Sequence, residues 1–66
     1  MFSFLEENFS TEDGTYIGYS LISPAGKCIC KDVTCDINLI SDIVSKANRF
    51  HLSDEQAFYI CEDAIV

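Results

Sequence analysis

Alternating apolar residues begin the chain and predict a β-strand near its N-terminus. Phe2 and Phe4 alternate with a polar residue, and Phe9 continues the apolar pattern. An Asp13-Gly14 pair separates this segment from residues 16–22, which are rich in aromatic and β-branched residues, so a hairpin is predicted. Residues 16–22 have apolar side chains at both odd and even positions, which point to opposite faces of a strand. We therefore expect a central strand covered on one face and partly shielded on the other.

A third strand is predicted over residues 27–34, after a turn formed by residues 23–26. Pro24 and Gly26 favour that turn, because proline presets φ at its first central position and glycine supplies a flexible exit. Two lysines in this strand discourage further pairing, so we expect it to lie at an edge of the sheet. Alternation places residues on its two faces as follows: Cys28 and Cys30 on one, and Ile29, Lys31 and Val33 on the other.

The second half of the chain has the 3.6-residue period of amphipathic helices. Residues 37–49 form the first helix, and Asp36 is a suitable N-cap for it. Ser53 and Gln56 have the spacing of a capping box, which predicts a second helix from this point to near Val66. The periodicity predicts burial against one sheet face for these residues: Ile37, Ile40, Ile43, Val44 and Ala47 from the first helix, and Phe58, Ile60 and Ile65 from the second.

These elements predict the α+β class, with a small antiparallel three-stranded sheet (β-β-β) followed by two helices packed on one face. Residues 1–66 contain no internal repeat, low-complexity stretch or linker, and the chain is too short for a second domain. We therefore expect a single small α+β domain. Because so short a chain buries little core, a disulfide, a metal or a second subunit would add stability that one core lacks.

The chain is acidic, with 11 Asp and Glu residues against 4 Lys and Arg residues and a net charge of −7. Phosphate backbones require clustered positive charge, so we expect no direct nucleic-acid binding. The acidity provides solubility, or alternatively a surface that docks on a basic partner. No apolar run approaches the length of a membrane span, and the acidic N-terminus does not resemble a secretory signal, so we expect a cytoplasmic protein without membrane contact.

The spacing of cysteine and histidine does not match a metal or catalytic site. The four cysteines include no C-x2-C pair of the kind that zinc sites use; they are Cys28, Cys30, Cys35 and Cys61. We expect Cys61 to be a small core residue and His51, the only histidine, to be a solvated or capping residue between the helices. The glycines fit no phosphate-binding loop. We therefore predict no metal, no cofactor, no small-molecule substrate and no enzymatic activity.

Four short stretches share a pattern with a known family. They are the Asp13-Gly14 pair, Tyr16-Ile17-Gly18-Tyr19, Asp32-Val33-Thr34 before a helix, and Asn48 with Leu52-Ser53 and Glu62-Asp63-Ala64-Ile65. Together they resemble a family of short uncharacterised proteins from Clostridia-type Firmicutes, a domain of unknown function, over residues 9–66. The resemblance implies a small bacterial cytosolic protein. It carries over no catalytic or binding residue, and the four cysteines lie outside the pattern.

Four apolar residues have no evident place in the predicted core: Phe2, Phe4, Tyr59 and Val66. They either pack as satellites beneath the helices or form a partner-binding patch, since aromatic side chains are enriched in interface cores. We predict a non-enzymatic protein–protein interaction or regulatory accessory factor, with a protein partner or self-association. The alternative is an acidic nucleic-acid mimic or inhibitor that occupies a basic groove of a partner protein, which would require acidic residues in rows along one face.

Overall fold

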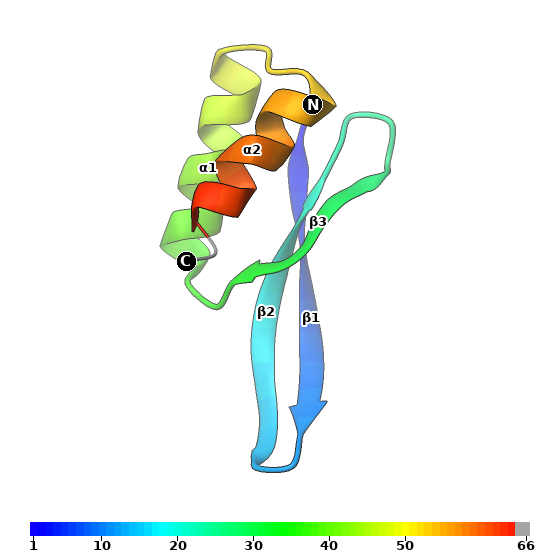
Figure 1. Cartoon of the computed structure of the whole chain (residues 1–66), viewed down its shortest axis with the longest axis vertical. Coiled ribbons are helices and arrows are strands. Elements are labelled where there is room, and N and C mark those ends of the chain that lie inside the picture. Colours follow the sequence, from blue (N-terminus) through cyan, green and yellow to red (C-terminus); the bar gives the residue numbers. More distant parts are fainter. Residues whose placement is uncertain (65–66) are drawn as a thin grey trace.

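A long antiparallel hairpin begins the fold (Figure 1). The computed structural model describes residues 1–64, and its first two strands are β1 (Ser3–Thr11) and β2 (Gly14–Ile22). The two strands pair in one constant register, from Ser3 opposite Ile22 to Thr11 opposite Gly14. The predicted hairpin is confirmed, but its two loop residues are Glu12 and Asp13, one position earlier than expected. Gly14 begins β2 with a φ of +132°, a conformation that side chains disfavour.

The third strand, β3 (Cys28–Thr34), lies at an edge of the sheet, as its lysines predicted. The strand order is β1-β2-β3, so β2 is central. The predicted turn before β3 is closed by a 2.9 Å hydrogen bond from the Gly26 N–H to the Ser23 carbonyl, and Gly26 has a φ of +85°. This φ explains the need for glycine at the end of the turn.

The pairing of β3 with β2 is irregular. Between two matched pairs, Tyr19–Thr34 and Leu21–Cys30, β3 contains two more residues than β2. Asp32 lies in this bulge with a φ of +54°, and its N–H donates a 3.0 Å hydrogen bond to Ser20 Oγ. The bulge breaks the alternation, so Cys30 and Val33 both contact the core. The prediction that these two residues lie on opposite faces is therefore wrong.

Helix α1 (Ile37–Arg49) has the predicted bounds and N-cap. The Asp36 side chain accepts a 2.9 Å hydrogen bond from the Asn38 N–H. At the other end, the Leu52 N–H donates to the Ala47 carbonyl at 3.0 Å, and His51 has a φ of +51°. These two features form a Schellman cap, in which a left-handed residue follows the helix. The prediction of a solvated or capping role for His51 is confirmed.

Helix α2 (Asp54–Ala64) begins with the predicted capping box. The Ser53 N–H donates to Gln56 Oε1 at 3.0 Å, and the Gln56 N–H donates to Ser53 Oγ at 3.2 Å. The predicted continuation to near Val66 falls partly outside the described residues, as does Ile65. Neither helix, over the part of the chain that is described, is long and apolar enough to cross a membrane.

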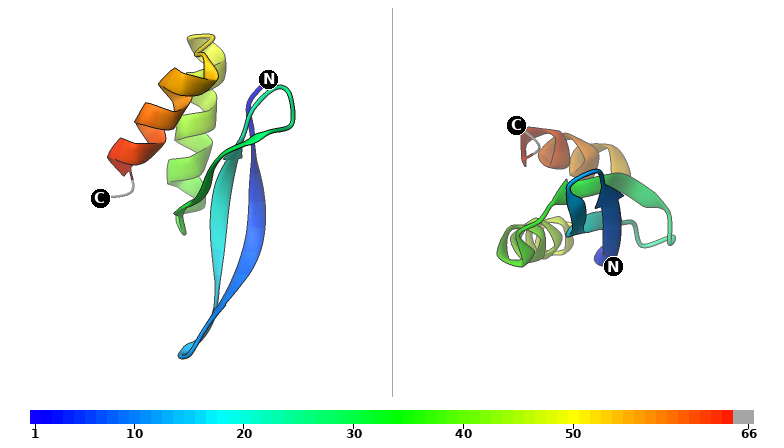
Figure 2. Two further views of the ribbon diagram at one scale, coloured as in Figure 1. Left: turned by 45° about the vertical axis from the view of Figure 1, so that its right-hand side comes forward. Right: turned by 90° about the horizontal axis from the view of Figure 1, so that it is seen from below.

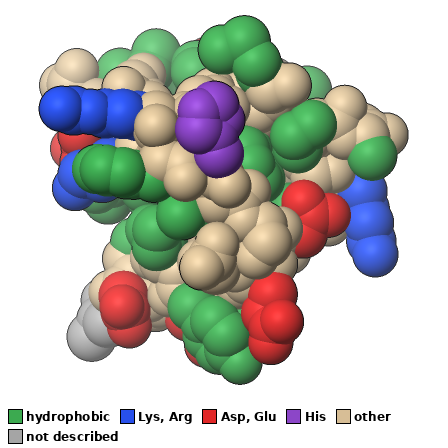
Figure 3. Space-filling model, turned by 90° about the horizontal axis from the view of Figure 1, so that it is seen from above, with side chains coloured by type: hydrophobic (Ala, Val, Ile, Leu, Met, Phe, Trp, Pro, Cys, Tyr) green, Lys and Arg blue, Asp and Glu red, His purple; other side chains and the backbone are tan. Residues whose placement is uncertain are grey.

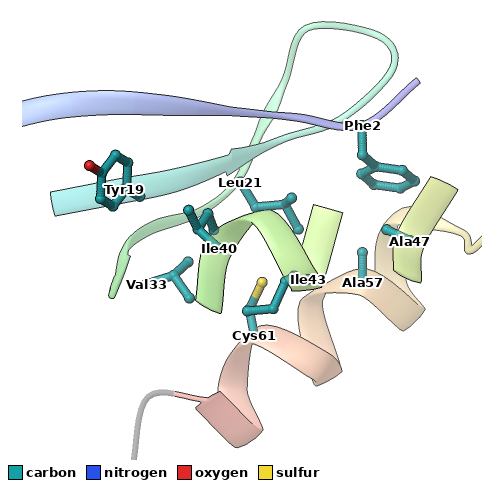
Figure 4. Close-up of a cluster of buried hydrophobic side chains, with 9 residues drawn as sticks. All are labelled: Phe2, Tyr19, Leu21, Val33, Ile40, Ile43, Ala47, Ala57 and Cys61. Atoms are coloured by element: carbon teal, nitrogen blue, oxygen red, sulfur yellow. The ribbon is translucent and has the colours of Figure 1, made fainter. Parts of the chain in front are cut away.

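Both helices pack against the sheet, and one hydrophobic core fills the space between them (Figure 4). This arrangement confirms the predicted α+β fold. The buried hydrophobic residues come from all five elements or their immediate neighbours: Phe2, Tyr19, Leu21, Val33, Ile40, Ile43, Ala47, Ala57 and Cys61.

The buried stripe of each helix is narrower than its apolar arc. Ile37 is 49% exposed, because it lies in the first turn of α1 at the margin of the core. Phe58 is also exposed, because it follows Ala57 by one residue and therefore points about 100° away from Ala57 around the axis of α2. The predicted burial of these two residues is wrong, whereas the predicted burial of Ile40, Ile43 and Ala47 is confirmed.

Candidate functional site

The structure separates the residues predicted to form a partner-binding patch. Phe2 is only 6% exposed and belongs to the core, which fits packing beneath the helices and not a partner-binding patch. Phe4 and Tyr59 are exposed, Tyr59 with 56% of its surface, but they lie on β1 and α2 respectively. Val66 lies outside the described residues. Among the described residues, the burial of Phe2 therefore leaves no surface patch that contains Phe2, Phe4 and Tyr59 together.

Phe2 is buried because α1 holds the start of the chain. The Phe2 N–H donates to Asn48 Oδ1 at 2.6 Å, and Asn48 Nδ2 donates to the Phe2 carbonyl at 3.0 Å. One carboxamide thus satisfies both backbone groups, as a neighbouring strand would. In Figure 4 the Phe2 ring points from the N-terminal segment toward the helices, near Ala47. Because the partners are 46 residues apart, local sequence patterns could not indicate this contact.

The distal half of the β1–β2 hairpin projects beyond the helices and the core. We call this half, residues 7–18, the hairpin arm (Figures 1 and 2). The arm accounts for the elongated shape of the molecule, which extends 38 × 23 × 18 Å. It contains the acidic residues Glu7, Glu12 and Asp13 and has no Lys, Arg or His. Tyr16 and Ile17 are exposed on it. The arm therefore combines apolar side chains with negative charge.

One face of the arm carries an aromatic pair. The Phe9 and Tyr16 rings stack with centroids 5.3 Å apart. The Tyr16 hydroxyl donates a 2.7 Å hydrogen bond to Asp32, and this bond raises the pKa of Tyr16 above its ordinary value. Lys31 Nζ lies 5.8 Å from the centre of the Phe9 ring, within the range of a cation–π contact. Bulged strand β3 thus supports the arm at its base.

Gly18 leaves the space in which this cluster forms. A Cβ atom at this position would lie 2.8 Å from Phe9 Cε2 and would also clash with the Asp32 carboxylate. A glycine within a strand is typical of such a close approach, and this was the one sequence signal for the cluster.

The opposite face of the sheet, which faces the helices, carries a second aromatic pair near the base of the arm. Phe4 and Tyr19 make an edge-to-face contact with centroids 5.6 Å apart. The Tyr19 hydroxyl donates a 3.2 Å hydrogen bond to Glu6. Burial, together with this bond, raises the pKa of Tyr19. Glu6 and Glu7 point to opposite faces, because successive side chains of a strand alternate.

The cysteines do not form a metal site. Within the described residues, no group of three or more His, Cys, Asp or Glu side chains could hold a metal ion. Cys28 and Cys35 are exposed, and all four cysteines are free thiols. Cys61 is buried, as predicted, and its thiol interacts with that of Cys30. Burial raises the pKa of Cys61 from 9.0 to about 11, so this thiol is a weak nucleophile at neutral pH.

A surface pocket of about 440 Å³ lies at the end of the molecule where α1 ends and the chain begins. Phe2, Asn48 and His51 line it together with Met1, Pro24, Ala47 and Leu52. Figure 3 views this end and shows the histidine side chain at the surface. Asn48 already uses its carboxamide on Phe2, so His51 is the polar side chain that remains in the lining of this pocket.

Comparison of the chain with protein-family models, curated proteins and solved structures finds no match. The resemblance to the Clostridia-type family therefore stays a prediction. The hairpin arm, with its exposed aromatic and acidic residues, is the candidate functional site.

Proposed function

We propose that the protein is a non-enzymatic interaction factor that docks on a basic partner protein through its hairpin arm. One observation carries this proposal: the arm projects from the core, exposes Tyr16 and Ile17, and contains three acidic residues and no basic residue among residues 7–18. Exposed apolar groups rimmed by polar ones are typical of interaction sites. Negative charge steers the arm toward a positive surface.

The second candidate, an acidic mimic that fills a nucleic-acid groove, uses the same charges but needs them in a row. Within the arm, Glu7 lies on one face of β1, whereas Glu12 and Asp13 form the loop at the tip. This scatter favours an interaction factor over a mimic of a regular phosphate backbone. A mimic would compete with DNA or RNA for its partner, and an interaction factor of the proposed kind would not.

Site-specific photocrosslinking in cells of the native host tests the proposal. A photoreactive amino acid replaces Ile17 on the arm in one variant and Tyr59 on α2 in the other, because both residues are exposed but lie on different elements. We expect an adduct of defined mass from position 17 and none from position 59. The mass of the adduct distinguishes another protein from a second copy.

Two results would contradict the proposal. Adducts from position 59 alone would place the interaction surface on α2. The absence of adducts from both positions, with the protein folded and present at its normal level, would remove the arm as a docking element.

A further inference from the structure

The two edges of the sheet differ in their protection against pairing with another strand. β3 has seven residues, a bulged register and an exposed lysine, Lys31. β1 has nine residues in a constant register and contains neither lysine nor proline. Short length, bulges, charged side chains and proline are the usual devices that block an edge strand, and Glu6 and Glu7 are the ones that β1 carries. β1 is therefore the edge that a chain of opposite charge can reach.

The backbone groups along this edge can be assigned from Phe2. Successive residues of an antiparallel strand direct their N–H and C=O groups to alternate sides. Phe2 directs its groups away from β2, where the Asn48 carboxamide binds both. Glu6, Asn8 and Ser10 have the same parity, so their backbone groups point to the outer edge. No hydrogen bond within residues 1–64 occupies them.

We infer that the outer edge of β1 binds an extended segment of a basic protein by β-strand addition. This inference rests on the proposed function and specifies the partner's chemistry. The backbone groups of Glu6, Asn8 and Ser10 would supply affinity, and the side chains beside them would select the sequence. The Asn48 carboxamide shows the same pairing with a side chain in place of a strand.

The charges on β1 argue against a second copy as the occupant. Glu7 is the central residue of the strand, so a symmetric antiparallel pair that overlaps along the whole of β1 would place Glu7 opposite Glu7. A parallel pair in register would align both Glu6 and Glu7 with their copies. Like charges that lie directly opposite each other destabilise a strand pair. The same two residues would attract a segment of opposite charge.

The geometry also specifies the order of residues in the partner. Glu6 and Glu7 occupy opposite faces, so two adjacent Lys or Arg residues would place one cation beside each carboxylate. Exposed Leu5 and half-buried Phe9 lie on the same face as Glu7. Apolar residues two positions from the basic pair would cover them. The occupant is therefore an extended segment with a central basic pair and apolar neighbours.

Synthetic peptides test the inference directly. The probe has nine residues, matching the length of β1, with Lys at its central position, Arg next to it and alternating Val and Thr at the other positions. One control peptide has Glu-Glu at the centre. A second keeps Lys-Arg but has its four central backbone nitrogens methylated, which removes strand pairing and preserves charge. Fluorescence anisotropy measures each affinity, and NMR hydrogen exchange measures each protein amide.

We expect the Lys-Arg peptide to bind at least about tenfold more tightly than either control. Bound peptide should slow exchange of the Glu6, Asn8 and Ser10 amides more than exchange of their neighbours. Asn8→Pro removes one outward N–H and should weaken binding about tenfold, whereas Asn8→Ala should change it less than about threefold. The double variant Glu6→Lys, Glu7→Lys should prefer the Glu-Glu peptide. Circular dichroism verifies that each variant is folded.

Equal binding of the methylated peptide would overturn the inference, because charge alone would then explain affinity. So would failure of the Lys-Arg peptide to bind, or sedimentation that shows a dimer in which the same amides are protected. If any of these results occurs while photocrosslinking from position 17 still yields an adduct with another protein, strand addition is wrong and the proposed docking function stands; an adduct with a second copy would contradict both. If the Lys-Arg peptide binds but the photoreactive residue at position 17 yields no adduct, the proposed docking of the hairpin arm on a partner protein is wrong.

Discussion

Gly18 is a residue at which the smallest side chain has a structural role. Phe9 and the Asp32 carboxylate occupy the space that a Cβ atom would need. Elsewhere in a strand, replacing glycine by alanine is favourable, because glycine loses more conformational freedom on folding. At Gly18 the close approach of these side chains makes the same substitution destabilising.

We expect Gly18→Ala to destabilise the protein by about 1–2 kcal/mol in chemical denaturation. The Asp32 carboxylate should move away from the new methyl group, and the pKa of Tyr16 should fall toward its ordinary value, because the bond to Asp32 raises it. An ultraviolet titration of the tyrosines measures this change. In a protein that already carries Asp32→Ala, Gly18→Ala should destabilise less, because the carboxylate is no longer there to clash with the new methyl group. An unchanged stability together with an unchanged tyrosine titration would contradict the packing at Gly18.

Cys61 makes folding stability depend on alkaline pH. Its pKa is raised to about 11 in the folded protein from an ordinary value of 9.0, so the folded state retains the proton more strongly. The resulting stability is fully present below about pH 9 and is lost as the pH rises toward 11. With reductant present, we expect the free energy of unfolding to fall less steeply between pH 8 and about 10.5 in Cys61→Ala than in the wild type. Identical slopes would show that the buried thiol does not titrate in this way.

Helix α1 has both buried and exposed apolar residues. Ile37 and Ile43 belong to one apolar arc, yet Ile37 is 49% exposed and Ile43 is 4% exposed. Ile43→Ala should cost about 2–4 kcal/mol, from lost burial and the cavity that remains. Ile37→Ala is the matched control and should cost less than about 1 kcal/mol. Thermal melts of the two variants provide the test. If the whole apolar arc of α1 were buried, the two substitutions would destabilise the protein to a similar extent.

The C-terminal end of α1 offers a stabilising substitution. His51 adopts a left-handed φ of +51°, which costs a residue with a Cβ atom more than it costs glycine. We expect His51→Gly to raise the free energy of unfolding by about 0.5–1 kcal/mol. His51→Ala keeps the strained conformation and should give no gain. A gain with alanine equal to that with glycine would instead indicate an unfavourable contact of the imidazole.

For the molecule as a whole, the core lies beneath only part of the sheet. The helices cover the base of the hairpin, and residues 7–18 extend beyond them (Figures 1 and 2). Segments with few buried contacts open at lower free energy than core elements. We expect the amides of Phe9 and Tyr16 to exchange with solvent at least about tenfold faster than those of Ile40 and Ile43, as NMR exchange would measure. Equal protection would mean that the arm opens only with the core.

Local interactions made much of this fold predictable. The bounds of α1, its Asp36 cap and the capping box of α2 depend on residues within four positions of one another, and all three were correct. The hairpin and the central place of β2 also followed from turn residues and the apolar pattern. The bulge at Asp32 did not, because an irregular register depends on how β3 fits against the helices and β2.

The candidate site was less predictable than the fold. Counting apolar residues without a place in the core identified Phe4 and Tyr59, which are exposed. It left Phe2 open between packing beneath the helices and a surface patch, because the burial of Phe2 depends on a carboxamide 46 residues away. It also could not identify the arm, because periodicity does not show where helices end relative to strands.

The sequence by itself determined the order and kind of the elements, their caps and turns, and the acidity of the chain. Each of these follows from neighbouring residues, whose side chains and backbone interact whatever the rest of the chain does. Only the tertiary structure decided which apolar residues are buried, which edge of the sheet is free, and that an acidic, aromatic hairpin extends past the core. Those properties depend on the placement of whole elements, and small differences in length and register change which side chains meet and which face solvent.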